Sequence, residues 1–282
     1  MAAFEQYRRY ADQFHRRLRA RRDLRGLADA NPQIADAIID AVSGKTSKIE
    51  QAWIGRIEEL RSSMSGSSEE LEITDYGAGS GNLKSTEEEM HRGRRIRTTI
   101  GKVCAISRGD RTALLLFRLV RALKPHTCIE LGTSVGISGC YQAAALKLNG
   151  AGKLITLEGA DSLASIAVRN FASLGLDNIE VIRGRFQDTL SGVLAANPAV
   201  DYAFIDGHHE EASTVNYFNA LLPVLVTSAV VVFDDIRWSE GMKRAWDVIR
   251  GHRRVRASVD LGPMGLVSAA GTECSQHFTT AF

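Results

Sequence analysis

Acidic side chains follow two apolar runs in the second half of the sequence. The run VDYAFID ends at Asp206, and the run AVVVFDD ends at Asp234 and Asp235. Both runs have the composition of buried parallel strands, and the carboxyl ends of neighbouring parallel strands meet at one edge of a sheet. We therefore expect these three carboxylates to lie close together if the two strands are neighbours.

This acidic cluster predicts a metal site. Three carboxylates in one water-poor site cannot all remain charged unless a cation joins them. Their oxygen atoms suit Mg²⁺, with Mn²⁺ or Ca²⁺ as alternatives, whereas zinc is less suited because no thiolate accompanies them. Asp206, Asp234 and Asp235 are therefore predicted as ligands of a divalent metal ion. The structural alternative is that each acid caps the helix that follows its strand.

A pair of histidines, His208 and His209, follows Asp206 after one glycine. An imidazole titrates near neutral pH and can accept a proton without a large change in its pKa. We predict His209 as a catalytic general base that works beside Asp206, with His208 as a supporting or solvent-exposed neighbour. The alternative is that the pair only begins a polar helix.

Two glycine-rich stretches could bring the backbone close to a nucleotide-like ligand: DYGAGSG at 75–81 and IELGTSVGIS at 129–138. Such a loop works when a strand leads into it and a helix begins directly after it. The first stretch lies between polar segments, so we interpret it as a flexible segment that folds over the active site as a lid. The second follows a buried-strand pattern and precedes an alanine-rich helix, so Gly132 and Gly136 are expected to frame the ligand-binding turn.

The next predicted strand, KLITLE, ends at Glu158. An acid at this distance beyond a ligand-binding loop can accept hydrogen bonds from the two hydroxyls of a ribose. Glu158 is therefore a candidate for holding a nucleoside. The alternative is an exposed acid that simply closes its strand.

The elements that must position these residues alternate regularly. Short apolar runs follow helical patterns from about residue 105 onward, which predicts a parallel sheet with helices on both faces and right-handed connections. VRASVDL and MGLVSA are separated only by GP, which predicts an antiparallel hairpin at one edge. The expected fold class is α/β, with a doubly wound, Rossmann-like, mostly parallel sheet.

The first hundred residues are dominated by helical periodicity. Apolar and mostly aromatic side chains recur at steps of three and four, at Phe4, Tyr7, Tyr10, Phe14 and Leu18. This spacing places a stripe along one side of a helix. We expect the stripe to pack against the body of the protein or a second subunit, and we predict a homodimer formed through the helical part. The chain then divides into a helical N-terminal extension with a flexible Gly/Ser segment (1–104) and an α/β domain (105–282).

Composition excludes several classes of protein. The formal net charge is +2, and basic residues gather near the N-terminus and in RGRRIR at 92–97. Such segments bind nucleic acid or acidic lipid, or form a solvated helix face, and interleaved acids favour the solvated face. The four cysteines lack a CxxC pair, which indicates neither a zinc site nor a disulfide framework. The most apolar stretch, 224–233, is too short to span a bilayer, and no hydrophobic signal core is present, so we expect a cytoplasmic protein.

Five motifs in order, ELGTSVGIS, LEG, RGRFQDTL, FIDGHH and VVFDDI, resemble those of class I S-adenosylmethionine-dependent methyltransferases over about residues 105–270. The IDGxH and FDD elements most resemble the metal-dependent O-methyltransferases, the branch of catechol and macrolide-sugar O-methyltransferases. Many members read GxGxG in the first motif, where Thr133 and Ser134 stand between the glycines here.

This resemblance implies that S-adenosylmethionine is the cofactor. It implies that Glu130, Gly132 and Gly136 surround the methionine and sugar, that Glu158 holds the ribose, and that Arg185 and Phe186 lie near the adenine. Thr133, Ser134 and Asp206 complete the predicted cofactor-binding set. The expected reaction is methyl transfer to a hydroxyl of a small molecule, assisted by Mg²⁺, with His209 taking the proton. A sugar, a catechol or a polyketide-like hydroxyl are all open as acceptors.

Three other functions are weighed against this expectation. A nucleic-acid methyltransferase would carry an NPPY-like element after the fourth strand or a Pro-Cys nucleophile, and the sequence has IDGHH there and no Pro-Cys dipeptide. A nicotinamide dehydrogenase would carry GxGxxG after its first strand. A non-catalytic cofactor-binding scaffold would have lost some of the charged site residues, and all of them are present.

Overall fold

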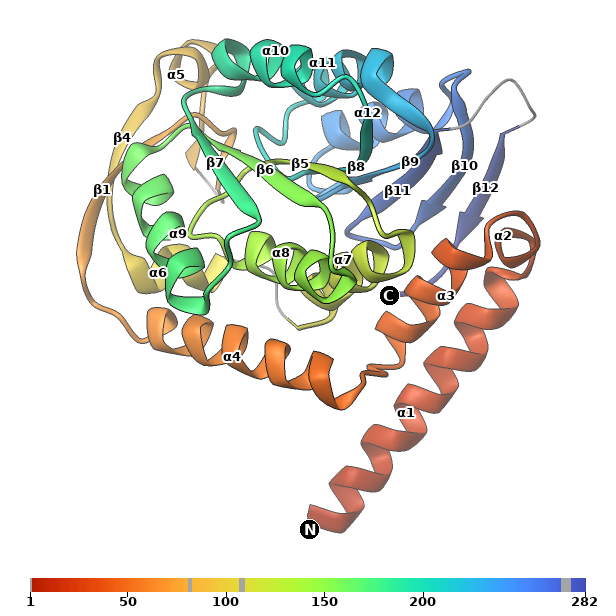
Figure 1. The fold of residues 1–282 in the computed structure, drawn as a ribbon. Helices are drawn as coiled ribbons and strands as arrows, with labels where there is room; N and C mark the ends of the chain where they lie inside the picture. Colours follow the sequence, from red (N-terminus) through yellow and green to blue (C-terminus); the bar gives the residue numbers. More distant parts are fainter. Residues whose placement is uncertain (1, 81–82, 107–109, 270–274) are drawn as a thin grey trace.

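A computed structural model describes residues 2–80, 83–106, 110–269 and 275–282. Its centre is an eight-stranded sheet with helices on both faces (Figure 1). In spatial order the strands are β12 (Gln276–Thr279), β10 (Val255–Asp260), β11 (Gly265–Ala269), β9 (Leu225–Phe233), β8 (Val200–Ile205), β5 (Thr127–Leu131), β6 (Lys153–Glu158) and β7 (Ile179–Arg183). β11 runs antiparallel to both of its neighbours, and the other neighbouring pairs are parallel. The expected doubly wound, mostly parallel α/β sheet is confirmed.

The predicted hairpin of β10 and β11 is present, but it does not form the edge of the sheet. β12 pairs with β10 in parallel and lies outside it. The sequence of β12, QHFT, is short and mostly polar, so it gave no apolar run from which a strand could be predicted. The expected edge position of the hairpin is therefore wrong by one strand.

Two hydrophobic cores lie on opposite faces of the sheet. Alternate residues of β8 contribute to each, with Tyr202 and Phe204 in one core and Ala203 and Ile205 in the other. This alternation follows from the two-residue period of a strand. The helices of the first face are α7 (Asp110–Leu123), α8 (Ile137–Asn149) and α9 (Asp161–Leu174), and those of the second are α10 (Phe186–Ala196), α11 (Glu211–Leu221) and α12 (Glu240–Arg250), with a 3₁₀ turn at Leu222–Val224.

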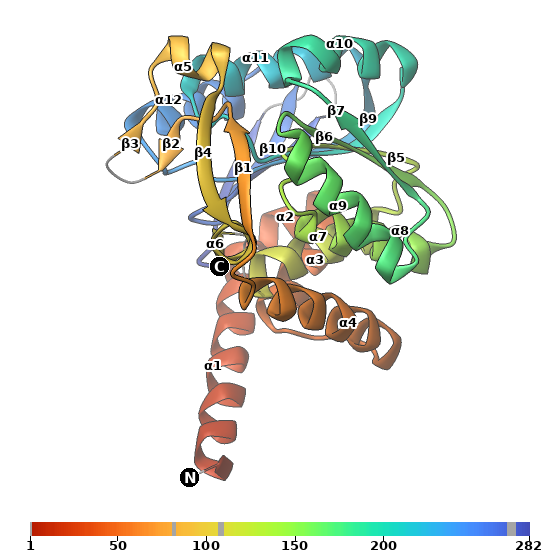
Figure 2. The ribbon, with the colours of Figure 1, turned by 90° about the vertical axis from the view of Figure 1, so that its left-hand side faces the viewer.

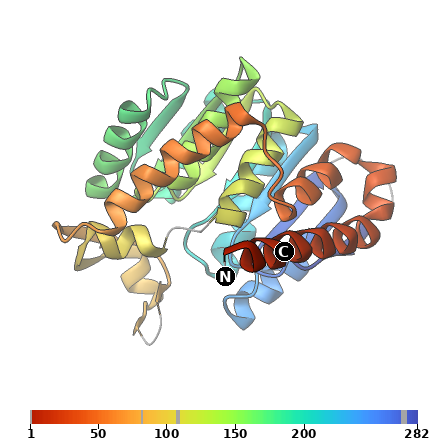
Figure 3. The ribbon, with the colours of Figure 1, turned by 90° about the horizontal axis from the view of Figure 1, so that it is seen from below.

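The N-terminal helices add to the first core, apart from α5, whose described residues do not belong to it. They are α1 (Ala2–Asp23), α2 (Arg25–Ala30), α3 (Pro32–Val42), α4 (Lys48–Ser65), α5 (Glu87–Arg92) and α6 (Ile100–Ile106). Seen from below, α4 lies across α8 and α9 (Figure 3). The buried residues of α3 and α4 belong to the same hydrophobic cluster as those of α7 and α8. The division expected between residues 104 and 105 falls inside α6.

The N-terminal part is not purely helical, which corrects the expectation of a helical extension. Residues Glu70–Asp75 form β1 and Arg94–Thr99 form β4, and the two strands pair antiparallel (Figure 2). Gly79–Ser80 and Leu83–Lys84 form a second, very short pair, β2 and β3. The side chains of β1 and β4 alternate between exposed and partly buried, and Arg95 and Arg97 pair with Glu72. The basic RGRRIR segment thus spans the end of α5 and the start of β4, and the three arginines that lie in β4 face acids of β1.

Helix α1 extends away from the rest of the molecule toward the N-terminus (Figures 1 and 2). Phe14 and Leu18 of the predicted apolar stripe are 60% and 48% exposed. The side chains of Phe4, Tyr7 and Tyr10 lie outside the part that the structure describes. Over the described residues, no helix combines the length and apolar character needed to cross a bilayer.

Candidate active site

The three predicted acids follow two neighbouring strands. β8 and β9 pair in parallel with Ile205 opposite Phe233, so that Asp206 and Asp234 leave the sheet side by side. The backbone N–H of Asp234 donates to the carbonyl of Ile205 (2.9 Å), and that of Asp206 donates to the carbonyl of Leu131 (2.8 Å). The expectation that these strands are neighbours is therefore correct.

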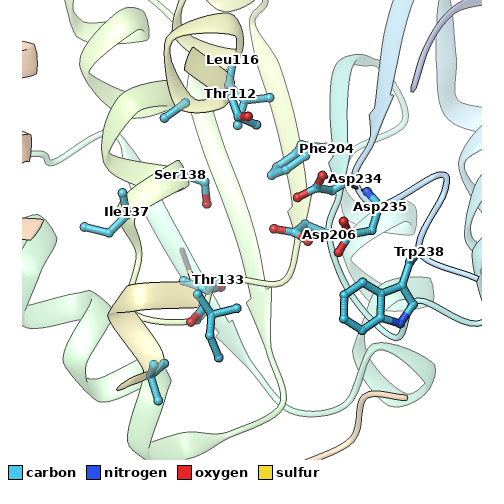
Figure 4. A pocket seen from close by; sticks show the side chains of 14 residues that line it. Thr112, Leu116, Thr133, Ile137, Ser138, Phe204, Asp206, Asp234, Asp235 and Trp238 are labelled. Carbon is cyan, nitrogen blue, oxygen red and sulfur yellow. Dashed lines mark hydrogen bonds between the residues drawn. The ribbon is translucent and has the colours of Figure 1, made fainter. Parts of the chain in front are cut away.

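A cavity of about 310 Å³ lies at this edge, and we call it the carboxylate cavity. Asp206, Asp234 and Asp235 line one side of it, with Ser138 and Thr133 across the space (Figure 4). Its remaining wall is largely apolar and includes Val103, Ile106, Leu116, Phe204 and Trp238. The predicted acids thus share one cavity with groups that can contact an apolar ligand.

His209 lies between two of the acids. Its Nε2 is 3.6 Å from Asp206 Oδ1, and its Nδ1 is 3.9 Å from Asp235 Oδ2. The ring is also near Trp238, with centroids 6.4 Å apart. The sequence prediction of His209 beside Asp206 agrees with this placement.

The backbone around these residues is strained. Ser134, His208, His209 and Asp235 all have positive φ angles between 47° and 65°, a region that non-glycine residues rarely adopt. Such conformations persist only where the surrounding structure enforces them, and they cluster at functional sites. The strain supports assigning this edge as the active site.

Asp206, Asp234 and Asp235 offer the oxygen donors that suit a divalent cation, and all three line one cavity. Asp234 is buried, and its Oδ1 accepts a hydrogen bond from the Asp235 backbone (2.8 Å). Within the described residues, however, no three His, Cys, Asp or Glu side chains stand close enough together to hold an ion. Carboxylate oxygens are the ligands that Mg²⁺ accepts, but these three would have to rotate toward one point.

A second cavity of about 190 Å³, the glycine-loop cavity, adjoins the first. Ser134 and Asp206 line both cavities. The other predicted cofactor residues that line it are Gly132, Glu158, Arg185 and Phe186. Six of the predicted cofactor-binding residues therefore surround one cavity.

Glu158 anchors the glycine turn. Its Oε2 accepts from the Ser134 backbone (2.7 Å), and its Oε1 accepts from the Ala160 backbone (2.8 Å). Burial raises the pKa of this carboxyl, and the nearby charge of Asp75 raises it further, against the lowering effect of those hydrogen bonds. Glu158 thus already holds the turn in the geometry that a ligand would meet.

Gly132 is required by close backbone packing. Its φ is +105°, and a Cβ atom there would overlap the carbonyl oxygen of Asp206. Only glycine lets the ends of β5 and β8 approach this closely. Gly136, with φ of +88°, instead precedes α8 and faces the Phe171 ring, so it lines neither cavity.

Glu130 also lines neither cavity, although the resemblance implied that it contacts the cofactor. It is fully buried, with Oε1 accepting from the Gln142 amide (2.7 Å) and Oε2 from the Thr156 hydroxyl (2.6 Å). The Thr156 hydroxyl is also 2.6 Å from that of Thr133. Burial raises the pKa of Glu130 to about 7. Glu130 therefore supports the turn from below.

His208 is buried beside the glycine-loop cavity. Its Nδ1 is 2.7 Å from the Tyr217 hydroxyl, and its ring packs edge-on against Phe186. Burial lowers the pKa of the His208 imidazole, so it stays neutral under conditions where an exposed histidine would be partly charged. It serves as packing for Phe186 rather than as a solvent-exposed neighbour.

Sequence reasoning missed two sets of lining residues. Residues 73–77 of the N-terminal part line the glycine-loop cavity. The polar flanks of DYGAGSG had argued against it as the ligand-binding turn and favoured a lid. The paired acids and arginines of β1 and β4 were the signal that could have shown a strand pair. Residues of α6 and α7 line the carboxylate cavity, and no sequence pattern indicates which side of these helices faces a ligand.

Comparisons with known proteins agree with this geometry. Residues 129–236 match the family described as "Methyltransferase domain". A search of curated proteins found no match. Among solved structures, the chain is similar to an O-methyltransferase from Bacillus cereus in complex with SAH, with 22% identity and a TM-score of 0.53 over 60% of this chain and 85% of that chain.

Two further solved structures extend this likeness. TomG, an O-methyltransferase from Streptomyces achromogenes involved in tomaymycin synthesis and solved with SAM, has 24% identity and a TM-score of 0.52 over 59% of this chain and 82% of that chain. Cofactor-bound Rv0187 from MTB has 19% identity and a TM-score of 0.52, and covers 85% of this chain and 97% of that chain. At these identities the likeness shows the fold. The chain therefore has the fold of these solved methyltransferases, and residues 129–236 match a methyltransferase-domain family.

Proposed function

We propose that this protein is an S-adenosylmethionine-dependent O-methyltransferase that acts on a hydroxyl group of a small molecule. The observation that carries the proposal is that two cavities of different character meet at Ser134 and Asp206. The glycine-loop cavity has a tight turn and Glu158, which suit the nucleoside of the methyl donor. The carboxylate cavity has three acids, and His209 lies beside two of them, which suits a group that must lose a proton.

The reaction that fits this arrangement is a direct transfer. The acceptor oxygen forms a bond to the methyl carbon, the bond between that carbon and sulfur breaks, and both of its electrons stay on sulfur. S-adenosylhomocysteine is the second product. The hydroxyl proton passes to His209, whose Nε2 lies 3.6 Å from Asp206 Oδ1 and whose Nδ1 lies 3.9 Å from Asp235 Oδ2.

We further propose that Asp206, Asp234 and Asp235 hold a divalent cation, for which Mg²⁺ suits the donors best. The support is their common cavity and oxygen-only chemistry. A cation held there would lower the pKa of the acceptor hydroxyl and fix its oxygen in line with the methyl carbon.

The walls of the carboxylate cavity favour an uncharged acceptor with an apolar body. Ile106 and Trp238 are 77% and 51% exposed, and both line this cavity together with the buried Phe204. Among its described lining residues there is no lysine or arginine that would offset a phosphate. A nucleic-acid acceptor is disfavoured for the same reason, and Arg95 and Arg97 are paired with Glu72.

We also propose that the protein is a cytoplasmic homodimer. The exposed Phe14 and Leu18 on α1 support a homodimer formed through this helix. The thiols of Cys104, Cys128 and Cys140 are buried and form no disulfide. They support a reducing compartment, and we propose the cytoplasm.

Calorimetry tests the two ligand sites. Wild type should bind S-adenosylmethionine, and Glu158→Gln should bind it at least about tenfold more weakly because a ribose hydroxyl loses a charged acceptor. Asp235→Asn should lose Mg²⁺ binding and keep cofactor affinity, since Asp235 lines only the carboxylate cavity. Asp247→Asn, an exposed acid on α12, is the matched control. Failure of wild type to bind the cofactor would disprove the proposed function. Unchanged Mg²⁺ binding in Asp235→Asn would disprove the proposed metal site.

Transfer of a radiolabelled methyl group to a panel of phenols, sugars and polyketide-like alcohols tests the chemistry. With an acceptor found, His209→Gln should lower kcat by about 10²–10⁴-fold, because the proton loses its positioned acceptor. Its cofactor affinity should be unchanged, since His209 does not line the glycine-loop cavity. A His209→Gln enzyme with the wild-type kcat would contradict the assignment of His209 as the base.

A further inference from the structure

If the proposed function is correct, the two ends of the glycine-loop cavity must hold different parts of the cofactor. The end at Ser134 and Asp206 joins the carboxylate cavity, so the reactive sulfonium must lie there. Glu158, which suits the ribose, lies next along the sheet edge. The adenine must then occupy the remaining end, which is lined by Gly159, Ala160 and Leu163 together with Tyr76 from the N-terminal part.

At this adenine end, the residue that follows Glu158 is Gly159, which contributes no side chain to the wall. A Cβ atom on Gly159 would lie 2.8 Å from Cδ2 and 3.2 Å from Cε2 of the Tyr76 ring. The Tyr76 ring therefore fills the space that a side chain at residue 159 would take. Gly159 is not among the glycines with positive φ, so its backbone would accept a side chain if Tyr76 were absent.

Tyr76 is held in place by an arm that consists of β1, β4 and the residues between them. The backbone N–H of Ala78 donates to the carbonyl of His208 (3.0 Å), beyond the end of β8. The Ser162 hydroxyl at the start of α9 donates to the carbonyl of Glu72 (2.9 Å). On the third side, Arg185 Nη1 donates to the carbonyl of His91 (2.8 Å). The arm is thus fastened at three points around the mouth of the cavity.

The loop at the tip of the arm is internally fixed as well. Asp75 Oδ1 accepts a hydrogen bond from the backbone N–H of Gly77 (2.8 Å), and Asp75 Oδ2 is 3.9 Å from Arg94 on β4. These contacts bracket Tyr76 on both sides in the sequence. The backbone next to Tyr76 is therefore already ordered, which reduces the conformational entropy that the segment could lose on binding.

We propose that Tyr76 is a cofactor-binding residue whose ring packs against the adenine of S-adenosylmethionine, so that the cofactor site is completed by the N-terminal arm. The flat ring supplies the apolar contact that Gly159 lacks. Packing of an aromatic ring against a base typically changes affinity by tenfold or more when the ring is removed. Residues 75–77 of the DYGAGSG motif therefore belong to the cofactor site, although a different loop forms the turn.

Calorimetric titration of S-adenosylhomocysteine and of adenosine into the full chain tests the proposal. Tyr76→Ala should weaken both ligands by about the same factor, tenfold or more, because the lost contact is to the base that they share. Tyr76→Phe should bind within about twofold of wild type. Gly159→Leu in the Tyr76→Ala background should recover most of the affinity, because its side chain fills the vacated space.

Ser162→Ala is the control for a weakened attachment of the arm. It removes the hydrogen bond to the Glu72 carbonyl and keeps the Tyr76 ring. It should bind both ligands within about threefold of wild type. Equal affinity of Tyr76→Ala and wild type for both ligands would overturn the role of Tyr76 while leaving the proposed function intact. Absence of binding in wild type would instead overturn both. Weak binding in Tyr76→Ala that Gly159→Leu cannot recover would show that Tyr76 only anchors the arm, and would also overturn the proposal.

Discussion

Glu130 illustrates at the scale of a residue how a carboxyl group can serve a site without touching its ligands. It lies in the strand that leads to the glycine turn and has no exposed surface. Its hydrogen bonds from Gln142 and Thr156 connect it to Thr133, which lines the carboxylate cavity. The position of the turn above the sheet therefore depends on a buried acid.

The raised pKa of Glu130 predicts a dependence of stability on pH. Burial raises this pKa from 4.5 to about 7, so between these values the folded state keeps a proton that the unfolded state has released. The free energy of unfolding should therefore fall as the pH rises through this range, by up to about 3 kcal/mol from this group. Urea denaturation at pH 5 and pH 8 measures it.

Glu130→Gln should remove this part of the pH dependence, because an amide does not titrate. Glu180→Gln, an exposed acid on β7, is the control and should keep the wild-type slope. If Glu130→Gln and wild type lose the same stability between the two pH values, the buried proton is not on Glu130.

The site residues that could be predicted are those that end an apolar strand or directly follow one. Asp206, Asp234 and Glu158 are such residues, because the end of a parallel strand fixes the edge at which they emerge. Glu130 lies one residue before the end of its strand, where alternation turns its side chain into the first core instead. Tyr76 could not be predicted, since its contact with Gly159 joins segments more than eighty residues apart and depends on the arm.

At the scale of elements, a buried ion pair joins the N-terminal helices to the sheet domain. Glu50 in the first turn of α4 accepts from the backbone N–H of Ser47, which is the helix N-cap. The same carboxylate pairs with Arg118 of α7 (3.1 Å) and Arg121 (3.3 Å). Burial would raise the pKa of Glu50, but the Ser47 hydrogen bonds and the charge of Arg118 hold it below its usual value.

Glu50→Ala should destabilise the fold by about 3–5 kcal/mol, because it leaves the buried Arg118 guanidinium without its partner. Chemical denaturation followed by circular dichroism measures the change. Glu59→Ala, an exposed glutamate on the same helix, should change the free energy of unfolding by less than about 0.5 kcal/mol. Similar values for the two variants would mean that the pair contributes no more than a surface contact.

The sheet strands were predictable because each is an apolar run between helical patterns, as a strand buried on both faces must be. β1 and β4 were not, since each has one exposed face and their stability comes from pairing with each other and from cross-strand charges such as Glu72 with Arg95. In β1 the apolar alternation is limited to Leu71 and Ile73, which is too short to predict a strand by itself. The orientation of α6 and α7 toward the carboxylate cavity likewise depends on packing between elements.

At the scale of the whole molecule, α1 has two large apolar side chains that are exposed. Phe14 and Leu18 are four residues apart, so they lie on the same side of the helix. The sequence stripe allowed packing against the body or against a second subunit. Their exposure in the single chain favours the second subunit.

The Phe14→Asp, Leu18→Asp double variant should therefore convert a homodimer into a monomer, because two charges would be buried in the apolar interface. Light scattering during size-exclusion chromatography measures the molar mass. Arg16→Glu, an exposed change of charge on the same helix, should leave the dimer intact. A wild-type protein that is monomeric at micromolar concentration would refute this interface.

The left-handed backbone at Ser134, His208, His209 and Asp235 has a consequence for how this sequence could change. Each such residue costs the folded chain about 1 kcal/mol relative to glycine. Selection for thermal robustness alone would favour glycine or asparagine at these four places. An engineer who screens variants only by melting temperature would thus be led to replace residues of the proposed active site, and would obtain a more stable protein that lacks the proposed base and one proposed metal ligand.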